Sequence, residues 1–253
     1  MKIKRIIPCL LLRNNGLVKT VKFKDSTYIG DPINTVKIFN EKEVDELFFL
    51  DIDATKLHKE LPYDLIQNIA SECFMPFAYG GGIQSLQQIE RIIKSGAEKV
   101  IINTNAFLQK DFLAEAVKQF GSSTIAVSID VKREFVKGNV VYIKGGTQST
   151  DLTPVVYATR IEDAGAGEIL INSIDRDGVM EGYDIELIKS ISNSIRIPVI
   201  ACGGAGTLND FKSAVREGGA SAVAAGSFFV FHGKRRAVLI TYPSYSEISD
   251  LFN

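Results

Sequence analysis

The sequence predicts an α/β protein with the (β/α)8 barrel fold, also called a TIM barrel, formed by residues 1–253 as one domain. Three observations lead to this prediction. Eight short apolar runs have the composition of buried parallel strands, segments with helical periodicity separate these runs, and the second half of the chain repeats the pattern of the first. A strand and a helix that alternate eight times give this barrel. A doubly wound open sheet would need fewer strands and would leave the repeat unexplained.

The expected strands are rich in Ile, Val, Leu, Phe and Ala, which is typical of strands that are covered on both faces. In chain order they are RIIPCLLL, ELFFLDI, PFAYG, KVIIN, TIAVSID, EILINSI, PVIACG and SAVAAG. Between them, the spacing of apolar residues predicts helices, for example over residues 86–95, 111–120 and 208–217. No linker rich in Pro, Gly or Ser divides the chain, so we expect a single domain.

Composition and charge exclude several classes of protein. The formal net charge of −1 gives no broad basic field for a nucleic acid, and no run of about twenty apolar residues could span a membrane. Cys9, Cys73 and Cys202 lack CxxC spacing, and His58 and His232 lie far apart in the chain. These residues indicate reduced thiols and no zinc site. We therefore expect a cytoplasmic protein without a metal, a bound cofactor, or a nucleic-acid or membrane partner.

A glycine-rich stretch occurs once in each half of the chain. FAYGGGIQSL, residues 77–86, corresponds to IACGGAGTL, residues 200–208, after a shift of about 123 residues. The segments ELFFLDID and EILINSID correspond in the same way. A period near half the chain length predicts two fused half-barrels, about residues 1–120 and 121–253, related by pseudo-twofold symmetry.

Both glycine stretches precede a predicted helix, where free backbone N–H groups can bind an anion. Because the carboxyl ends of barrel strands share one face, we expect two phosphate cradles at one mouth, suited to a ligand with a phosphate at each end. The alternative is two tight turns that bind nothing. The expected residues are Gly81, Gly82, Asn103 and Thr104 in the first cradle and Gly203, Gly204, Gly226 and Ser227 in the second cradle.

Several motifs together resemble HisF, the cyclase subunit of imidazole glycerol phosphate synthase. They are KRIIPCL, GDP, DELFFLDI, GGGI, INT, GAGEIL, SIDRDG and GGAG, in this order from about residue 4 to residue 229. The resemblance implies a barrel that converts the bisphosphate PRFAR and ammonia into imidazole glycerol phosphate and AICAR. It also implies that a separate glutaminase subunit, HisH, forms a heterodimer with the barrel and delivers ammonia through it. Each glycine stretch would hold one phosphate.

In HisF, two opposed aspartates at the ends of the first and fifth strands carry the cyclisation. The fifth-strand acid is matched by Asp130, whereas the first-strand position is Leu11, and no acid lies elsewhere in residues 6–15. Ring closure needs an acid and a base on either side of the substrate, and loss of one typically lowers the rate by roughly two orders of magnitude or more. We therefore expect inefficient cyclase activity.

The resemblance also assigns a gate and a substrate-binding set. Arg5, Glu46, Lys99 and Glu168, each directly before a strand, match the charged ring that gates ammonia at the bottom of the HisF barrel. The alternative is that these four are solvated rim charges. Lys19 matches a substrate-binding position in the first loop, and Asp51 is expected to orient it. Asp175 and Asp177 either bind a hydroxyl group of the substrate or shape the turn.

The C-terminal segment, residues 226–245, differs from ordinary HisF. Together with VKFKDSTYIGDP and IFNEKEVDEL it resembles the HisF-like branch associated with acetamidino modification of sugars. This resemblance implies a HisH-like glutaminase and a sugar amidotransferase as partners in making a surface polysaccharide. The basic HGKRR patch, residues 232–236, either holds an acidic sugar or partner or is solvated surface.

Three functions remain open from the sequence. The chain could be the ammonia-handling subunit for sugar amidination, with the phosphate cradles retained for a phosphorylated small molecule. It could be a working imidazole glycerol phosphate synthase subunit in histidine biosynthesis, with Leu11 compensated by another group. It could also be a noncatalytic scaffold that activates the glutaminase.

Overall fold

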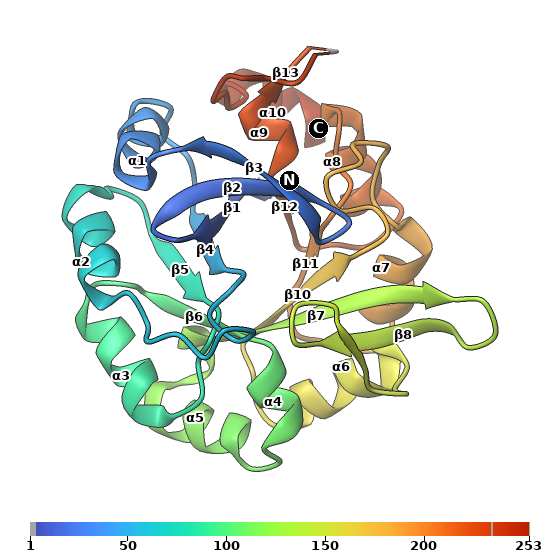
Figure 1. The fold of residues 1–253 in the computed structure, drawn as a ribbon. Coiled ribbons are helices and arrows are strands. Elements are labelled where there is room, and N and C mark those ends of the chain that lie inside the picture. Colours follow the sequence, from blue (N-terminus) through green and yellow to red (C-terminus); the bar gives the residue numbers. More distant parts are fainter. Residues whose placement is uncertain (1–3, 234, 253) are drawn as a thin grey trace.

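The computed structural model describes residues 4–233 and 235–252, and within these residues eight parallel strands close into a barrel (Figure 1). Each strand pairs with the next along the chain, and the last pairs with the first. The predicted fold and all eight predicted strands are confirmed. The barrel strands are β1 (Arg5–Arg13), β4 (Leu47–Asp51), β5 (Phe77–Gly80), β6 (Lys99–Ile102), β7 (Ile125–Glu134), β10 (Glu168–Ser173), β11 (Val199–Cys202) and β12 (Ala222–Ala225).

Helices surround the barrel and cover the outer face of its strands (Figure 1). They are α1 (Pro32–Glu41), α2 (Tyr63–Glu72), α3 (Leu86–Lys94), α4 (Thr104–Leu108), α5 (Phe112–Phe120), α6 (Pro154–Asp163), α7 (Ile185–Ser192), α8 (Leu208–Arg216), α9 (Ser227–Val230) and α10 (Tyr245–Phe252), with a 3-10 turn at Ser122–Thr124. The helices predicted over residues 86–95, 111–120 and 208–217 correspond to α3, α5 and α8.

The helices that follow the two glycine stretches begin with similar caps. The Ser85 hydroxyl accepts a hydrogen bond from the Gln88 amide at the start of α3. At the start of α8, Thr207 and Asp210 form a capping box. Each cap satisfies backbone N–H groups that have no partner inside the helix, so it determines where the glycine turn ends and the helix begins.

Three additional hairpins contain strands that the apolar pattern did not predict. The strands β2 (Gly16–Val21) and β3 (Lys24–Gly30) extend β1 at the rim of the barrel opening, and β8 (Gly138–Ile143) and β9 (Gln148–Ser149) extend β7 (Figure 1). The short strands β13 (Phe231–His232) and β14 (Ala237–Val238) pair beside α9. The strands β3 and β9 are polar and partly exposed, and β13 and β14 have two residues each, so these four strands lack the continuous apolar runs that identified the barrel strands.

The apolar core has two layers that follow from the alternation of side chains along each strand. The larger layer lies between the strands and the helices. The smaller layer fills the barrel lumen with Ile7, Cys9, Phe48, Ala78, Ile101, Ala126, Leu170, Ile200, Cys202, Ala222 and Ala224. Within the described residues, no helix combines the length and apolar character needed to cross a bilayer.

We predict that Phe48→Ala lowers the free energy of unfolding by about 3–5 kcal/mol, because Phe48 is fully buried in the lumen and its loss leaves a cavity. Urea unfolding at neutral pH measures this change. Phe74→Ala is the matched control, since that ring is 87% exposed, and it should change stability by no more than about 0.5 kcal/mol. Equal effects of the two substitutions would contradict this account of the core.

Candidate functional site

A cavity of about 670 Å³ opens at the carboxyl ends of the barrel strands. Its lining includes the last residues of β4, β6 and β11 and the loops that follow β5 and β12, which is where barrel enzymes place their reactive groups. Of the residues predicted to act on a substrate, the cavity contains Lys19, Asp51, Asp130 and Asp177. Leu11 also lines it.

Asp130 projects from β7 into this cavity and is 7% exposed. Its carboxylate accepts a hydrogen bond from the Asn103 amide nitrogen at 3.1 Å and one from the Ser128 hydroxyl at 3.4 Å. Burial raises the pKa of Asp130 to about 7; the two hydrogen bonds oppose this shift, and the nearby Asp177 carboxylate adds to it. A carboxyl group with this pKa can both donate and accept a proton near neutral pH.

Leu11 lies in β1, paired with Leu50 of β4 and Val18 of β2, and is 9% exposed. No proton can move to or from its side chain. Asp51 lines the same cavity, but one of its oxygens accepts the amide hydrogens of Asp53 at 3.0 Å and Ala54 at 2.9 Å. The Asp51 carboxylate therefore shapes its own loop and does not take the place of an acid at Leu11.

Lys19 is held by Asp177 and not by Asp51, so that part of the sequence prediction is wrong. Lys19 Nζ donates to Asp177 Oδ1 at 3.1 Å, and the Thr20 hydroxyl donates to Asp177 Oδ2 at 3.1 Å. Asp51 is unsuited to this role because its oxygen is bound to loop amides. Burial lowers the pKa of Lys19, but the facing Asp177 carboxylate more than offsets this and the net pKa is raised, so the ammonium stays charged.

Asp175 does not join the group of side chains in the cavity. Its carboxylate accepts the Arg133 amide hydrogen at 2.8 Å, which ties the loop after β10 to β7. The sequence placed Asp175 and Asp177 in one turn and could not separate their roles. In the structure, Asp177 lines the cavity, whereas Asp175 binds the backbone of the adjoining strand β7.

The residues predicted for the first cradle all line the large cavity. Gly81 has a φ of +108°, and a Cβ there would lie 2.2 Å from the Asp51 carbonyl oxygen, so this turn requires glycine. The Gly82 amide donates to the Thr55 hydroxyl at 3.2 Å. The Thr104 hydroxyl donates to Asn103 Oδ1 at 3.2 Å and accepts the Lys144 amide hydrogen at 2.9 Å.

The residues predicted for the second cradle line a small cavity of about 10 Å³ that adjoins the large one, and Lys19, Asp177 and Gly226 line both cavities. The predicted residues are Gly203, Gly204, Gly226 and Ser227. A Cβ on Gly226 would lie 2.7 Å from Lys19 Cε and 2.9 Å from Lys19 Nζ. The missing side chain at Gly226 thus leaves room for the lysine. A space of this volume holds about one water molecule.

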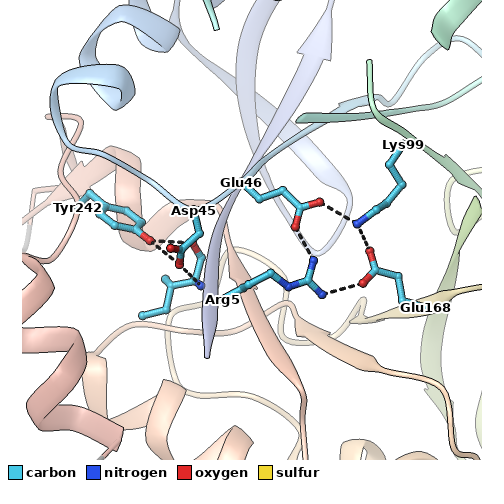
Figure 2. Close-up of polar contacts among 7 residues, drawn as sticks. Arg5, Asp45, Glu46, Lys99, Glu168 and Tyr242 are labelled. Atoms are coloured by element: carbon cyan, nitrogen blue, oxygen red, sulfur yellow. Dashed lines mark hydrogen bonds and ion pairs between the residues drawn. The ribbon is translucent and has the colours of Figure 1, made fainter. Parts of the chain in front are cut away.

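At the opposite end of the barrel, Arg5, Glu46, Lys99 and Glu168 form a closed ring of ion pairs (Figure 2). Arg5 contacts Glu46 at 2.5 Å and Glu168 at 2.7 Å, Lys99 contacts Glu46 at 2.9 Å, and Lys99 also pairs with Glu168. Burial alone would raise the pKa of Glu168, but Lys99 and Arg5 bring it below its ordinary value. Two positive and two negative charges cancel within this ring.

Figure 2 also shows Asp45 and Tyr242 to one side of the ring, next to Arg5. Asp45 Oδ2 accepts the Ile6 amide hydrogen at 3.1 Å, and the Tyr242 hydroxyl donates to the Ile6 carbonyl at 2.9 Å. Since Ile6 follows Arg5 and Asp45 precedes Glu46, these contacts fasten the backbone at both residues of one ion pair. The sequence contains no local signal for these contacts.

Two further cavity residues, Ser128 and Asn172, were not predicted from the sequence. Ser128 and Asn172 come from the same strands as Asp130 and Glu168, in runs that read only as apolar. Among the described residues, the buried Asn172 Oδ1 has no hydrogen-bond partner. Strand alternation could have indicated Ser128, which lies two residues before Asp130 and therefore faces the same side of β7.

In the part of the chain that the structure describes, no three His, Cys, Asp or Glu side chains are grouped in a way that could hold a metal ion. Cys9 and Cys202 are both buried at the cavity, and neither lies in a disulfide. A hydrogen bond with Cys9, followed by burial, raises the pKa of Cys202 well above its ordinary value, so this thiol stays protonated.

Comparison with known proteins identifies the family. The family model described as histidine biosynthesis protein matches residues 5–235. A Pseudomonas aeruginosa protein, provisionally named imidazole glycerol phosphate synthase subunit hisF2, is 51% identical over 245 residues, which cover 97% of this chain and 98% of that protein. The chain belongs to the HisF superfamily. A Leptospira interrogans protein with the provisional name of subunit HisF is 45% identical over 98% of both chains, and the Alkaliphilus metalliredigens subunit HisF is 42% identical over 90% of this chain and 91% of its own.

Membership of the HisF superfamily confirms the resemblance that the barrel motifs indicated. The matched region begins at Arg5 and extends beyond Ser227, so it includes both glycine stretches, Asp130 and the four-charge ring. The relatives are named as subunits of imidazole glycerol phosphate synthase.

We predict that Asp130→Asn removes a pH-dependent loss of stability. Between the ordinary pKa of 3.8 and the folded-state pKa of about 7, the folded protein keeps a proton that the unfolded chain has released. As the pH rises through this window, the free energy of unfolding of the wild type should therefore fall relative to that of the variant, by about 1.4 kcal/mol per pH unit. The difference should level off above pH 7. Urea unfolding of both proteins from pH 4.5 to 8 measures the difference; parallel curves would show that Asp130 titrates normally.

We also predict that Lys99→Met lowers the free energy of unfolding by about 3 kcal/mol at neutral pH, because two buried carboxylates would share Arg5 alone. The cost should shrink in acid, since the pKa of Glu168 is lowered by its partners and their contribution is lost as the pH falls through the folded-state pKa. Lys94→Met removes an exposed pair with Glu90 and should cost no more than about 0.5 kcal/mol. A Lys99→Met effect as small as this control would mean that the ring is not closed.

Proposed function

We propose that this chain is the synthase subunit of a glutamine amidotransferase complex and uses ammonia to build an amidine on a sugar. A HisH-like glutaminase would release ammonia at the bottom of the barrel, and the barrel would pass it to the mouth. There the ammonia would serve acetamidino modification of a surface-glycan sugar, together with a sugar amidotransferase. A phosphorylated small molecule would occupy the two glycine cradles.

The observation that carries this proposal is the combination of Leu11 opposite a retained Asp130 with an intact ring of charges below. The ring provides a polar plug whose charges cancel, which is the property that an ammonia gate needs. Leu11 deprives the mouth of the second proton-transfer group that ring closure requires. The passage of ammonia through the barrel is therefore better supported than the cyclisation of a substrate at its mouth.

The lumen between the ring and the mouth suits a neutral passenger. Its lining consists of apolar side chains and the thiols of Cys9 and Cys202. Neutral ammonia crosses an apolar stretch at a much lower desolvation cost than the ammonium ion. At the top of this stretch the first polar side chains are those around Asp130, including Ser128 and Asn172.

The second candidate function is the cyclisation itself, in histidine biosynthesis. It is favoured by relatives between 42% and 51% identical that are named as imidazole glycerol phosphate synthase subunits. In this case another group would have to replace the missing acid. Asp177 is near enough to raise the pKa of Asp130, but it is bound to Lys19 and Thr20.

We predict that the purified chain, supplied with ammonium salt and PRFAR, forms imidazole glycerol phosphate at least about 100-fold more slowly than Leu11→Asp. The new carboxylate would face the cavity that contains Asp130 and restore an acid and base pair. The assay follows the loss of PRFAR by its absorbance. Leu11→Asn is the matched control, because it introduces a polar group of the same size that cannot transfer a proton, and it should remain as slow as the wild type.

Wild-type turnover equal to that of Leu11→Asp would establish the cyclase function and contradict the first candidate. Reconstitution with the glutaminase and the amidotransferase tests sugar amidination directly. Nitrogen from 15N-amide glutamine should then appear in the sugar, as measured by mass spectrometry. Stimulation of the glutaminase without transfer of nitrogen would instead identify the chain as a scaffold.

A further inference from the structure

The basic HGKRR patch places one arginine against the second cradle. Arg236 Nη2 donates to the Gly178 carbonyl at 2.9 Å and to the Ser227 hydroxyl at 3.4 Å. Gly178 and Ser227 both line the small cavity that contains Gly203, Gly204 and Gly226. The guanidinium therefore lies at the rim of this cradle. Lys234, from the same patch, lies outside the described residues.

The structure holds this guanidinium in place. The Arg236 amide donates to the Gly233 carbonyl at 3.0 Å and closes the turn between β13 and β14. Arg236 Cζ lies 4.7 Å from the centroid of the Phe231 ring, a cation–π contact. After the hairpin, the Leu239 amide bonds the Val230 carbonyl, which anchors the returning chain to α9. A side chain that is already ordered loses less entropy when a ligand binds.

The charge of Arg236 is also uncompensated. Lys19, the other cation at this cradle, is already paired with Asp177 at 3.1 Å. Among the described residues, no carboxylate lies within 4.0 Å of the Arg236 guanidinium. Arg236 Nε and Nη1 donate no hydrogen bond to any described residue. Arginine has five N–H donors, so most of them remain for a ligand.

We propose that Arg236 binds the phosphoryl group of a phosphate monoester in the second cradle. A guanidinium can meet a phosphate with two parallel charge-assisted hydrogen bonds, and the backbone of the glycine turns supplies further donors. The proposal rests on the proposed function in one respect, that the second cradle holds a phosphate.

This assignment makes the two ends of the mouth chemically different. The large cavity, which contains the first cradle, is lined by Lys19, Lys56 and Lys144 and, within the described residues, by no arginine other than Arg13, which is paired with Asp53. A ligand with two phosphates would therefore bind in one orientation, with its more tightly held phosphate beside Arg236. The C-terminal hairpin would in this way determine which end of the ligand lies over Asp130.

The test is a titration of the full-length 15N-labelled chain with inorganic phosphate and, separately, with glycerol 3-phosphate, at constant ionic strength. Amide signals of Gly203 and Ser227 report the second cradle, and those of Gly82 and Thr104 report the first cradle. Arg236→Ala should weaken phosphate binding at the second cradle about tenfold and leave the first cradle unchanged. Arg235→Ala, which changes the exposed neighbouring arginine, should alter neither cradle by more than about twofold.

Arg236→Lys keeps the charge without the planar fork and should give an intermediate affinity at the second cradle. If the phosphate affinity of the second cradle is unchanged in both Arg236 variants, Arg236 has no role in binding, although the second cradle still binds phosphate. An equal loss at both cradles would show a general structural effect and would also overturn that role. If neither ligand shifts the second-cradle signals of the wild type, the proposed phosphate site fails and this inference fails with it.

Discussion

The two carboxylates at the bottom of the barrel can be buried only because two cations neutralise them. Glu46 and Glu168 are each less than a tenth exposed, and a carboxylate at that depth is stable only when cations and hydrogen bonds replace its water. Arg5 and Lys99 each bridge both carboxylates, so no member of the ring can be removed without leaving a charge behind. Everything above the ring depends on this balance, because it closes an apolar lumen with a polar plug.

Burial changes the pKa of a carboxyl group at the mouth in the opposite direction from that in the ring. Asp130 has hydrogen bonds but no cation in contact, so desolvation dominates and its pKa rises to about 7. In the ring, cations dominate and the pKa of Glu168 falls. One end of the barrel therefore carries permanent, cancelled charges, and the other carries a group that exchanges a proton near neutral pH. This division agrees with the proposed passage of ammonia from the ring to the mouth.

The twofold repeat in the sequence produces a symmetric backbone with asymmetric chemistry. Both glycine turns precede capped helices, and both face the mouth. The side chains around them differ, since the Lys19–Asp177 pair lines the small cavity at the second turn, whereas Lys56 and Lys144 line only the large cavity. The hairpin that carries Arg236 adds to this difference. The two glycine turns thus share a backbone pattern but have different side chains around them.

The sequence by itself determined the eight barrel strands, the bounds of α3, α5 and α8 to within one or two residues, and the presence of Leu11 where a second acid would stand. These features depend on local patterns, because strand and helix burial repeat within a few residues. Only the tertiary structure decided that Asp177 holds Lys19, that Asp175 turns to Arg133, and that Arg236 reaches Ser227. Lys19 and Asp177 are 158 positions apart. Such pairings are set by barrel closure and by competition for hydrogen-bond partners, which no local pattern records.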